Sequence, residues 1–302
     1  MKPKLTIFTP TYNRAHTLHL GYEALLRQTC TDFVWLIVDD GSTDQTRELV
    51  TGWMQEKKVS IRYHYQENQG VHVAHNTAYR LMDTELWVNV DSDDQLTDDA
   101  VEQIIACWEK ADQAKLAGII GLNQTYQGKI TESRLPEDRP YTTLTDFYYR
   151  LGGKGDKTLV YRTDLVKRYP PFPVFEGEKF FPLSHLYYQI DQDYSLWILN
   201  RPLKKIEYHS DGLSANIYLQ YWNNPRGFAY YRIQEMKVAP TFKRLATVCV
   251  HYVASCIRSR DKRWLSNSPC KELTCLCAPL GALLYLFIRY KVKNNRKYQV
   301  KY

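Results

Sequence analysis

The chain has 302 residues, 44% of them hydrophobic, which is enough to bury a sizeable core and excludes global disorder. The net charge of +7 is unevenly placed, because acidic residues cluster between Asp83 and Asp112 while the final RYKVKNNRKYQVKY holds six Lys or Arg and no acid. A tail of one sign predicts an anionic partner, either membrane headgroups or nucleic acid.

Strand and helix patterns alternate through the first hundred-odd residues. Apolar runs with strand composition cover 5–12, 33–38, 61–67 and 86–90, and a segment with helical spacing follows each of them. The run 33–38 is almost wholly apolar, as is typical of a strand covered on both faces. This alternation predicts an α/β fold with a mostly parallel sheet and helices on both faces.

The pattern weakens beyond residue 115. The sequence there predicts, in order, a strand–turn–strand unit over 118–131, irregular structure over 135–149, a helix over 183–190, and two strands in YSLWILN and LKKIEYH. From Asn216 onward the apolar spacing predicts helices. The predicted organisation is a domain over 1–214, with halves 1–110 and 111–214, followed by a helical region over 215–302.

The longest apolar segment, LTCLCAPLGALLYLFI (273–288), is shorter than the roughly 20 residues that span a bilayer as a helix. With the basic tail beside it, the segment predicts either a helix lying in a membrane interface or a buried helical hairpin. Seven scattered cysteines without CxxC spacing predict reduced thiols, and no signal peptide is recognisable. We therefore expect a cytoplasmic protein that is peripheral on the inner face of the cell membrane.

Polar clusters follow three of the predicted strands: Tyr12–Arg14, Asp39–Asp40 and Asp91–Asp94. In open parallel sheets, ligands bind outside the carboxyl ends of the strands. The three strands therefore direct polar side chains at one crevice.

The acids of DSDDQLTDDAVE (91–102) admit three interpretations. A calcium loop of the EF-hand type requires Gly where Leu96 stands, and a helix where a strand precedes the loop. A solvated helix start explains Asp98 and Asp99, but it does not explain why Asp91 directly follows a buried strand. A divalent cation held by few carboxylates and shared with a phosphate, the usual arrangement for Mg²⁺ or Mn²⁺, accounts for that position.

Four motifs, PTYNR (10–14), VDDGSTDQT (38–46), NQGVHVAHN (68–76) and VDSDD (90–94), resemble in order and spacing the nucleotide-sugar-binding half of family 2 glycosyltransferases of the GT-A fold. The resemblance covers about residues 4–110. Beyond them the chain is more weakly similar to bacterial enzymes that assemble capsular polysaccharides or exopolysaccharides, or that decorate wall polymers. The resemblance implies a metal-dependent, inverting hexosyl- or N-acetylhexosaminyl-transferase, with a UDP-sugar donor and a lipid-linked or polymeric saccharide acceptor.

The resemblance also implies roles for the matching residues. Asp40 would accept a hydrogen bond from the uracil base, and Asp91 would lie near the ribose and the metal. Asp93 would bind Mn²⁺ or Mg²⁺ directly, and the cation would stabilise the leaving diphosphate. His209 near Asp211 is a further candidate contact to the diphosphate or metal. The full set of implied nucleotide-sugar contacts is Pro10, Tyr12, Arg14, Asp40, His75, Asn76 and Asp91.

Inversion by a single displacement also needs a general base for the acceptor hydroxyl. Relatives usually place an Asp at the start of the helix after the acceptor-side loop, where this chain has Leu183 and Ser184. The favoured candidate base is Glu178, just before that helix, and Asp191 is the second.

The departure at Leu183 and Ser184 leaves open a second function, a non-catalytic nucleotide-sugar-binding subunit of a polysaccharide assembly complex. Nucleic-acid binding is not expected, because the basic tail adjoins an apolar segment rather than a nucleic-acid-binding fold. Membrane attraction explains the basic tail and the apolar segment together.

Overall fold

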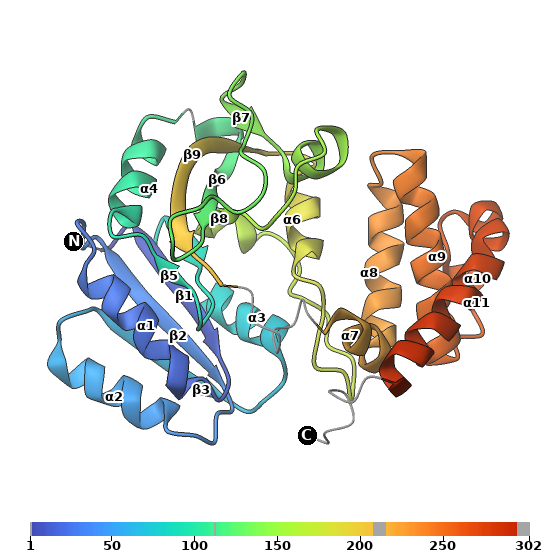
Figure 1. Ribbon diagram of the computed structural model, residues 1–302, viewed down its shortest axis with the longest axis horizontal. Coiled ribbons are helices and arrows are strands. Elements are labelled where there is room, and N and C mark those ends of the chain that lie inside the picture. Colours follow the sequence, from blue (N-terminus) through green and yellow to red (C-terminus); the bar gives the residue numbers. More distant parts are fainter. Residues whose placement is uncertain (1, 112, 208–215, 295–302) are drawn as a thin grey trace. The chain divides into compact units, whose positions relative to one another are not determined.

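The computed structural model describes residues 2–111, 113–207 and 216–294 (Figure 1). By packing, the chain divides into two compact units. The sheet unit is Met1–Pro171 with Asp193–Glu207, and the helical unit is Phe172–Gln192 with Tyr208–Tyr302. The segment Phe172–Gln192 thus packs with the C-terminal helices, whereas the predicted boundary at 214 places it in the first domain.

In the described part of the sheet unit, nine strands form one sheet in the order β3-β2-β1-β4-β8-β6-β9-β5, with β7 paired to β9. The first four strands along this order are parallel, β8 is antiparallel to both of its neighbours, and β6 and β9 are parallel. This mostly parallel sheet confirms the predicted α/β class. The strands are β1 (Leu5–Thr11), β2 (Phe33–Asp40), β3 (Ile61–Gln66), β4 (Leu86–Asn89), β5 (Gln95–Leu96), β6 (Leu116–Gln124), β7 (Tyr141–Thr142), β8 (Thr158–Arg162) and β9 (Ser195–Lys205).

Helices cover both faces of this sheet. Three helices share one apolar core with alternate residues of β1, β2 and β4: α1 (Ala15–Leu26), α2 (Thr46–Glu56) and α4 (Ala100–Glu109). Helix α3 (Val71–Leu81) packs on the opposite face, where the ring of His75 meets that of Phe8. Side chains alternate across a strand, so Ile7 and Phe8 of β1 face different helices. The remaining short helices of this unit are η1 (Gln113–Lys115), η2 (Asp146–Arg150) and α5 (Thr163–Val166).

The strand register brings the carboxyl ends of β1 to β4 to one edge of the sheet. Thr11 pairs with Asp39, Asp40 pairs with Gln66, and Phe8 pairs with Asn89. The segments that follow these strands therefore lie side by side, as the sequence predicted.

One strand replaces two that the sequence suggested. The segments YSLWILN and LKKIEYH contribute to a single strand, β9, which continues through Pro202. The irregularity lies in β9, which advances from Leu199 to Lys204 while its parallel partner β6 advances only from Gly121 to Asn123. The expected strand–turn–strand unit over 118–131 is reduced to β6 and an isolated bridge from Gln124 to Ile130.

The helical unit contains the helices that were expected after Asn216. Its core joins α8, α9 and α11 through side chains that include Met236, Val248, Tyr252 and Cys277. Helix α11 runs unbroken through 273–288, so the prediction of a buried helical hairpin is wrong. The helices are α6 (Ser184–Ile190), α7 (Ile217–Asn223), α8 (Pro225–Lys237), α9 (Phe242–Ser259), α10 (Trp264–Asn267) and α11 (Lys271–Asn294).

Candidate functional site

The loops that follow β1 and β2 are bonded to each other. The backbone N–H of Asn13 donates to Ser42 Oγ at 2.8 Å, and Asn13 Oδ1 accepts from the backbone N–H of Thr43 at 2.8 Å. Asn13 adopts φ +54°, a left-handed conformation that Asn tolerates well. The neighbouring ring of Tyr12 is 49% exposed at this fixed loop, and Pro10 and Arg14 flank it half-buried.

Asp39 closes the turn after β2. Its buried carboxylate accepts a hydrogen bond from the backbone N–H of Ser42 at 2.8 Å and another from the hydroxyl of Tyr63 at 2.6 Å. Burial and this bond to Asp39 raise the pKa of Tyr63, which therefore stays protonated and donating. The role of Asp39 is to hold the turn.

Asp40 is also buried, and it organises the loop that leads into α3. Its carboxylate accepts from Gln66 Nε2 at 2.7 Å and from the backbone N–H groups of Gln69 and Gly70 at 3.0 and 2.7 Å. Gly70 has φ +101°, a conformation that favours glycine. An ionised carboxylate offers about four acceptor positions. Three are used inside the protein, and about one remains for a ligand.

His75 belongs to the core and not to the crevice. Its ring is 0% exposed and packs against Phe8, Tyr79 and Trp87. Burial lowers the pKa of His75 to about 3, so the ring is neutral at physiological pH. The predicted donor contact of His75 is therefore wrong, because a ligand cannot reach an enclosed ring. The next residue, Asn76, is half-buried, and its donor contact stays a prediction.

The three acids after β4 lie in different environments. Asp91 is exposed and accepts from Asn89 Nδ2 at 2.9 Å, whereas Asp93 is half-buried. Asp94 is buried, and its backbone N–H donates to the carbonyl of Asp91 at 3.0 Å, which curls the loop into a tight turn. One sequence motif thus presents two accessible carboxylates and one enclosed carboxylate.

Lys204 neutralises the enclosed acid. The antiparallel pairing of β5 with β9 sets Leu96 opposite Lys204 and brings Lys204 Nζ to 3.0 Å from Asp94 Oδ2. Burial, with repulsion from Asp91 and Asp93, raises the pKa of Asp94 to about 6 despite the attraction of Lys204. The acids around it hold the pKa of Lys204 above its usual range even though the group is buried. The ammonium therefore stays charged and offsets one of the loop's three negative charges.

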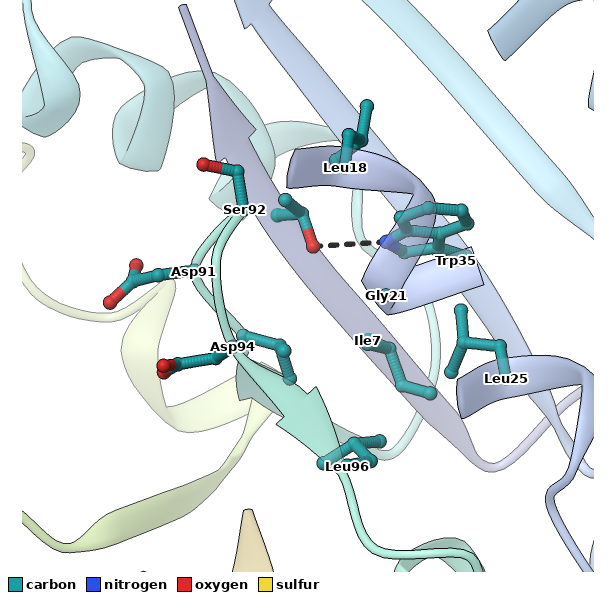
Figure 2. Close-up of a pocket in the computed structure, with 11 residues that line it drawn as sticks. Ile7, Leu18, Gly21, Leu25, Trp35, Asp91, Ser92, Asp94 and Leu96 are labelled. Atoms are coloured by element: carbon teal, nitrogen blue, oxygen red, sulfur yellow. Dashed lines mark hydrogen bonds between the residues drawn. The ribbon is translucent and has the colours of Figure 1, made fainter. Parts of the chain in front are cut away.

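An apolar floor supports this loop (Figure 2). A small pocket lies between β1, α1, the ring of Trp35 and the segment 90–96, and Trp35 Nε1 donates to Thr9 Oγ1 at 2.9 Å beside it. In Figure 2 the carboxylates of Asp91 and Asp94 lie on the side of the loop away from Trp35. The loop thus rests on side chains that include Ile7, Leu18 and Leu25.

The accessible pair, Asp91 and Asp93, fits a divalent cation. Among the described residues neither acid forms an ion pair, and no cluster of three or more His, Cys, Asp or Glu could hold a metal by itself. Mg²⁺ and similar ions are commonly bound by one or two carboxylates together with phosphate oxygens and water. Two accessible carboxylates that form no ion pair among the described residues match that kind of site.

Glu178 and Asp191 belong to the helical unit. The Glu178 carboxylate accepts from the backbone N–H groups of Arg226 and Gly227 at 2.9 and 2.8 Å and from Arg226 Nε at 3.1 Å. These contacts hold the first turn of α8. Asp191 is half-buried at the end of α6. Their catalytic roles stay predictions, and the candidates His209 and Asp211 lie outside the described residues.

The family model described as glycosyl transferase family 2 matches residues 6–167, more than half of the chain. The chain belongs to glycosyl transferase family 2. The match begins in β1 and ends just after α5, so it contains every strand-end cluster described above.

Curated relatives match this family 2 chain over about a third of the chain's length. Chondroitin synthase of Escherichia coli is 39% identical over 103 residues, which are 33% of this chain and 14% of that protein. Glycosyltransferase GlyA of Streptococcus pneumoniae is 34% identical over 101 residues, and the teichoic acid poly(glycerol phosphate) polymerase of Staphylococcus epidermidis is 33% identical over 99. The matched part spans 14% of each of these two proteins as well.

Solved structures match over nearly the whole family 2 chain. TarS 1–349 of S. aureus in complex with UDP-GlcNAc has a TM-score of 0.60 at 15% identity, covering 96% of this chain and 91% of that one. The mannosyltransferase PcManGT of Pyrobaculum calidifontis, in complex with GDP-Man and Mn²⁺, has a TM-score of 0.54 at 17% identity, covering 99% and 83%. These likenesses confirm the GT-A fold.

The residues that position the acids of this family 2 chain were not among the predicted site residues. Tyr63, Gln66 and Lys204 each bond to an acid from another strand. The Lys204 contact spans 110 residues along the chain and depends on the pairing of β5 with β9. A lysine inside a strand gives no local signal of such a partner.

Proposed function

We propose that this chain is an inverting glycosyltransferase that moves a sugar from a UDP-sugar to a lipid-linked or polymeric saccharide. The observation that carries the proposal is that the three acids after β4 have different surroundings. Lys204 offsets Asp94, and Asp91 and Asp93 stay accessible at the carboxyl edge of a family 2 sheet. The polymer-forming relatives and the UDP-GlcNAc complex of TarS support the choice of donor and acceptor class.

Each strand end has a part in donor binding. The exposed ring of Tyr12, between Pro10 and Arg14, packs on the uracil and ribose, and the remaining acceptor position of Asp40 takes the imide N–H of the base. Asp93 would hold Mn²⁺ or Mg²⁺ directly, and Asp91 would face the ribose and the metal. A cation bound there supplies Lewis-acid stabilisation of the negative charge on the departing diphosphate.

The transfer itself is a single displacement. An acceptor oxygen attacks the anomeric carbon, the bond from that carbon to the diphosphate breaks, and a carboxylate takes the proton of the acceptor hydroxyl. We favour Asp191 over Glu178 as this base, because both carboxylate oxygens of Glu178 already accept N–H groups at the start of α8. The transfer takes place at the inner face of the cell membrane, where lipid-linked acceptors lie.

A panel of UDP-sugars, incubated with Mn²⁺ and assayed for UDP release, tests the proposal. We expect wild-type protein to release UDP from one or a few donors and Asp93→Ala to lose activity by about 100-fold or more. Asp98→Ala is the matched control, since this exposed acid pairs with Arg27 on the surface. Undiminished turnover by Asp93→Ala would remove the metal-site assignment.

The second candidate function is a non-catalytic nucleotide-sugar-binding subunit. Two observations favour it: Leu183 and Ser184 stand where relatives carry an acid, and Ser184 Oγ is bonded to Tyr231 OH at 3.0 Å. Wild-type protein that binds UDP tightly with Mn²⁺ but turns over no donor would support the binding subunit. Loss of turnover in Asp191→Asn with donor binding retained would support the enzyme.

A further inference from the structure

Helix α11 carries an apolar face that points to solvent. Five of its apolar side chains are more than half exposed at three- and four-residue spacing: Leu276 at 77%, Leu280 at 58%, Leu283 at 61%, Leu286 at 53% and Tyr290 at 62%. Phe287 is also exposed beside them. We call these six residues the leucine face. No charged residue interrupts the helix between Glu272 and Arg289.

The opposite face of α11 fixes which way the leucine face points. Thr274, Cys277, Gly281 and Ile288 are buried on that side. A Cβ on Gly281 would lie 2.5 Å from the Cβ of Val253, so α9 and α11 approach as closely as glycine allows. Turning the helix to bury the leucines would break this packing. The exposure of the leucine face is therefore built into the helical unit.

An apolar strip of this kind is unusual on a soluble monomer and marks an interaction surface. The strip from Leu276 to Tyr290 extends about 20 Å along the helix. Surface helices normally turn charged side chains outward, and here the outward side chains are leucines. Something apolar is needed to cover them.

Charge indicates what covers the leucine face. Arg289, Lys291 and Lys293 follow the uncharged segment within the helix, and Lys291 Nζ lies 5.4 Å from the centre of the Phe287 ring. The printed sequence after 294 adds two lysines and one arginine, and no acid occurs after Glu272. Leucines with flanking cations of one sign match the two layers of an anionic bilayer surface, acyl chains below phosphate groups.

We propose that the leucine face of α11 docks onto an anionic lipid bilayer, with the helix lying in the interface and Arg289, Lys291 and Lys293 on the phosphate groups. The helix is long and apolar enough to span a bilayer. Spanning, however, would remove α11 from α9 and expose the core around Cys249, Val253 and Cys256. Docking in the plane leaves that core intact. The proposal does not depend on the donor site, and it gives the proposed transferase a route to lipid-linked acceptors.

Flotation of the full chain with lipid vesicles tests this proposal. We expect binding to vesicles of phosphatidylcholine mixed with phosphatidylglycerol and weaker binding to phosphatidylcholine alone. The double variant Leu280→Glu with Leu283→Glu should bind the mixed vesicles at least about tenfold more weakly. Met54→Glu is the matched control, because Met54 is an exposed apolar residue on a helix of the sheet unit.

A charge variant separates the two parts of the surface. Replacing Arg289, Lys291 and Lys293 by Gln should weaken binding to the mixed vesicles on the order of 100-fold. It should change binding to phosphatidylcholine little. Thermal unfolding and UDP binding of each variant show whether the fold and the donor site are intact, so a failure here is distinguishable from a failure of the proposed function.

Three results would overturn the proposal. The first is undiminished vesicle binding by the leucine double variant. The second is wild-type protein that stays in the vesicles after an alkaline carbonate wash, which indicates a spanning helix. The third is absence of vesicle binding together with a wild-type dimer that the double variant dissociates in sedimentation analysis. In that case the leucine face joins two copies of the chain.

Discussion

At the scale of single residues, neighbouring acids of one motif have different roles, because partners distant in the sequence decide which of them is buried and ion-paired. Asp91, Asp93 and Asp94 are chemically alike, but only Asp94 meets Lys204 in a buried pair. The sequence predicted that acids gather after β4, since they follow an apolar strand directly. It did not predict which acid is neutralised, because Lys204 comes from β9.

Removing Lys204 should destabilise the sheet unit. Lys204→Met leaves the buried carboxylate of Asp94 without its cation, and we expect a loss of about 3–5 kcal/mol in unfolding free energy. Denaturant unfolding monitored by circular dichroism measures it. Lys205→Met, at the next and less buried position of β9, should cost much less. If Lys204→Met were as stable as Lys205→Met, the pair would not hold the loop.

His75 should make the stability of the sheet unit depend on acidity. Its pKa is about 3 in the folded state and about 6.5 when unfolded, so the unfolded chain binds the proton between these values. Stability is therefore lost as pH falls below about 6.5, by about 2 kcal/mol between pH 7 and pH 5. His75→Gln should make this part of the stability curve less steep, whereas His16→Gln, at an exposed position, should not. Parallel curves for His75→Gln and wild type would contradict the assignment of His75 to the core.

At the scale of elements, local pattern predicted the first half of the chain well and the second half less well. The strands β1 to β4 and the helices between them follow a regular alternation of strand and helix, and each keeps its own periodicity in the fold. By contrast, β9 runs through Pro202 because β6 pairs with it on one side with a shifted register. That pairing joins strands about 80 residues apart and has no local signature.

The burial of His75 is a second feature that the local sequence pattern did not predict, here within one helix. The motif around it resembles a donor-binding segment, yet the ring lies on the side of α3 that faces β1. The available signal was the helical spacing of His75 with Ala78 and Tyr79, which are both buried.

Helix α8 should depend on Glu178. Glu178→Gln replaces one acceptor oxygen with an amide nitrogen and weakens the hold on the N–H groups of Arg226 and Gly227. We expect a loss of about 1–3 kcal/mol in unfolding free energy, measured by denaturant titration, with transfer activity retained. Glu176→Gln, at an exposed neighbouring position, should have little effect. An equally stable Glu178→Gln protein that has lost transfer would instead make Glu178 the base.

At the scale of the whole molecule, the chain combines a family 2 sheet unit with a helical unit that presents the leucine face. The fold class, the edge that carries the acids and the C-terminal helices could all be predicted, because they follow from periodicity and strand order. The grouping of Phe172–Gln192 with the helical unit could not. It depends on contacts such as Glu178 with the start of α8, which the spacing of apolar residues does not encode.

The most direct test of the account is a crystal structure of the chain with UDP and Mn²⁺, with anomalous scattering used to locate the manganese. We predict a manganese peak within bonding distance of an Asp93 carboxylate oxygen, phosphate oxygens of UDP on the same ion, and the uracil beside Asp40 and Tyr12. A nucleotide bound elsewhere, or manganese bound away from Asp91 and Asp93, would contradict the central claim.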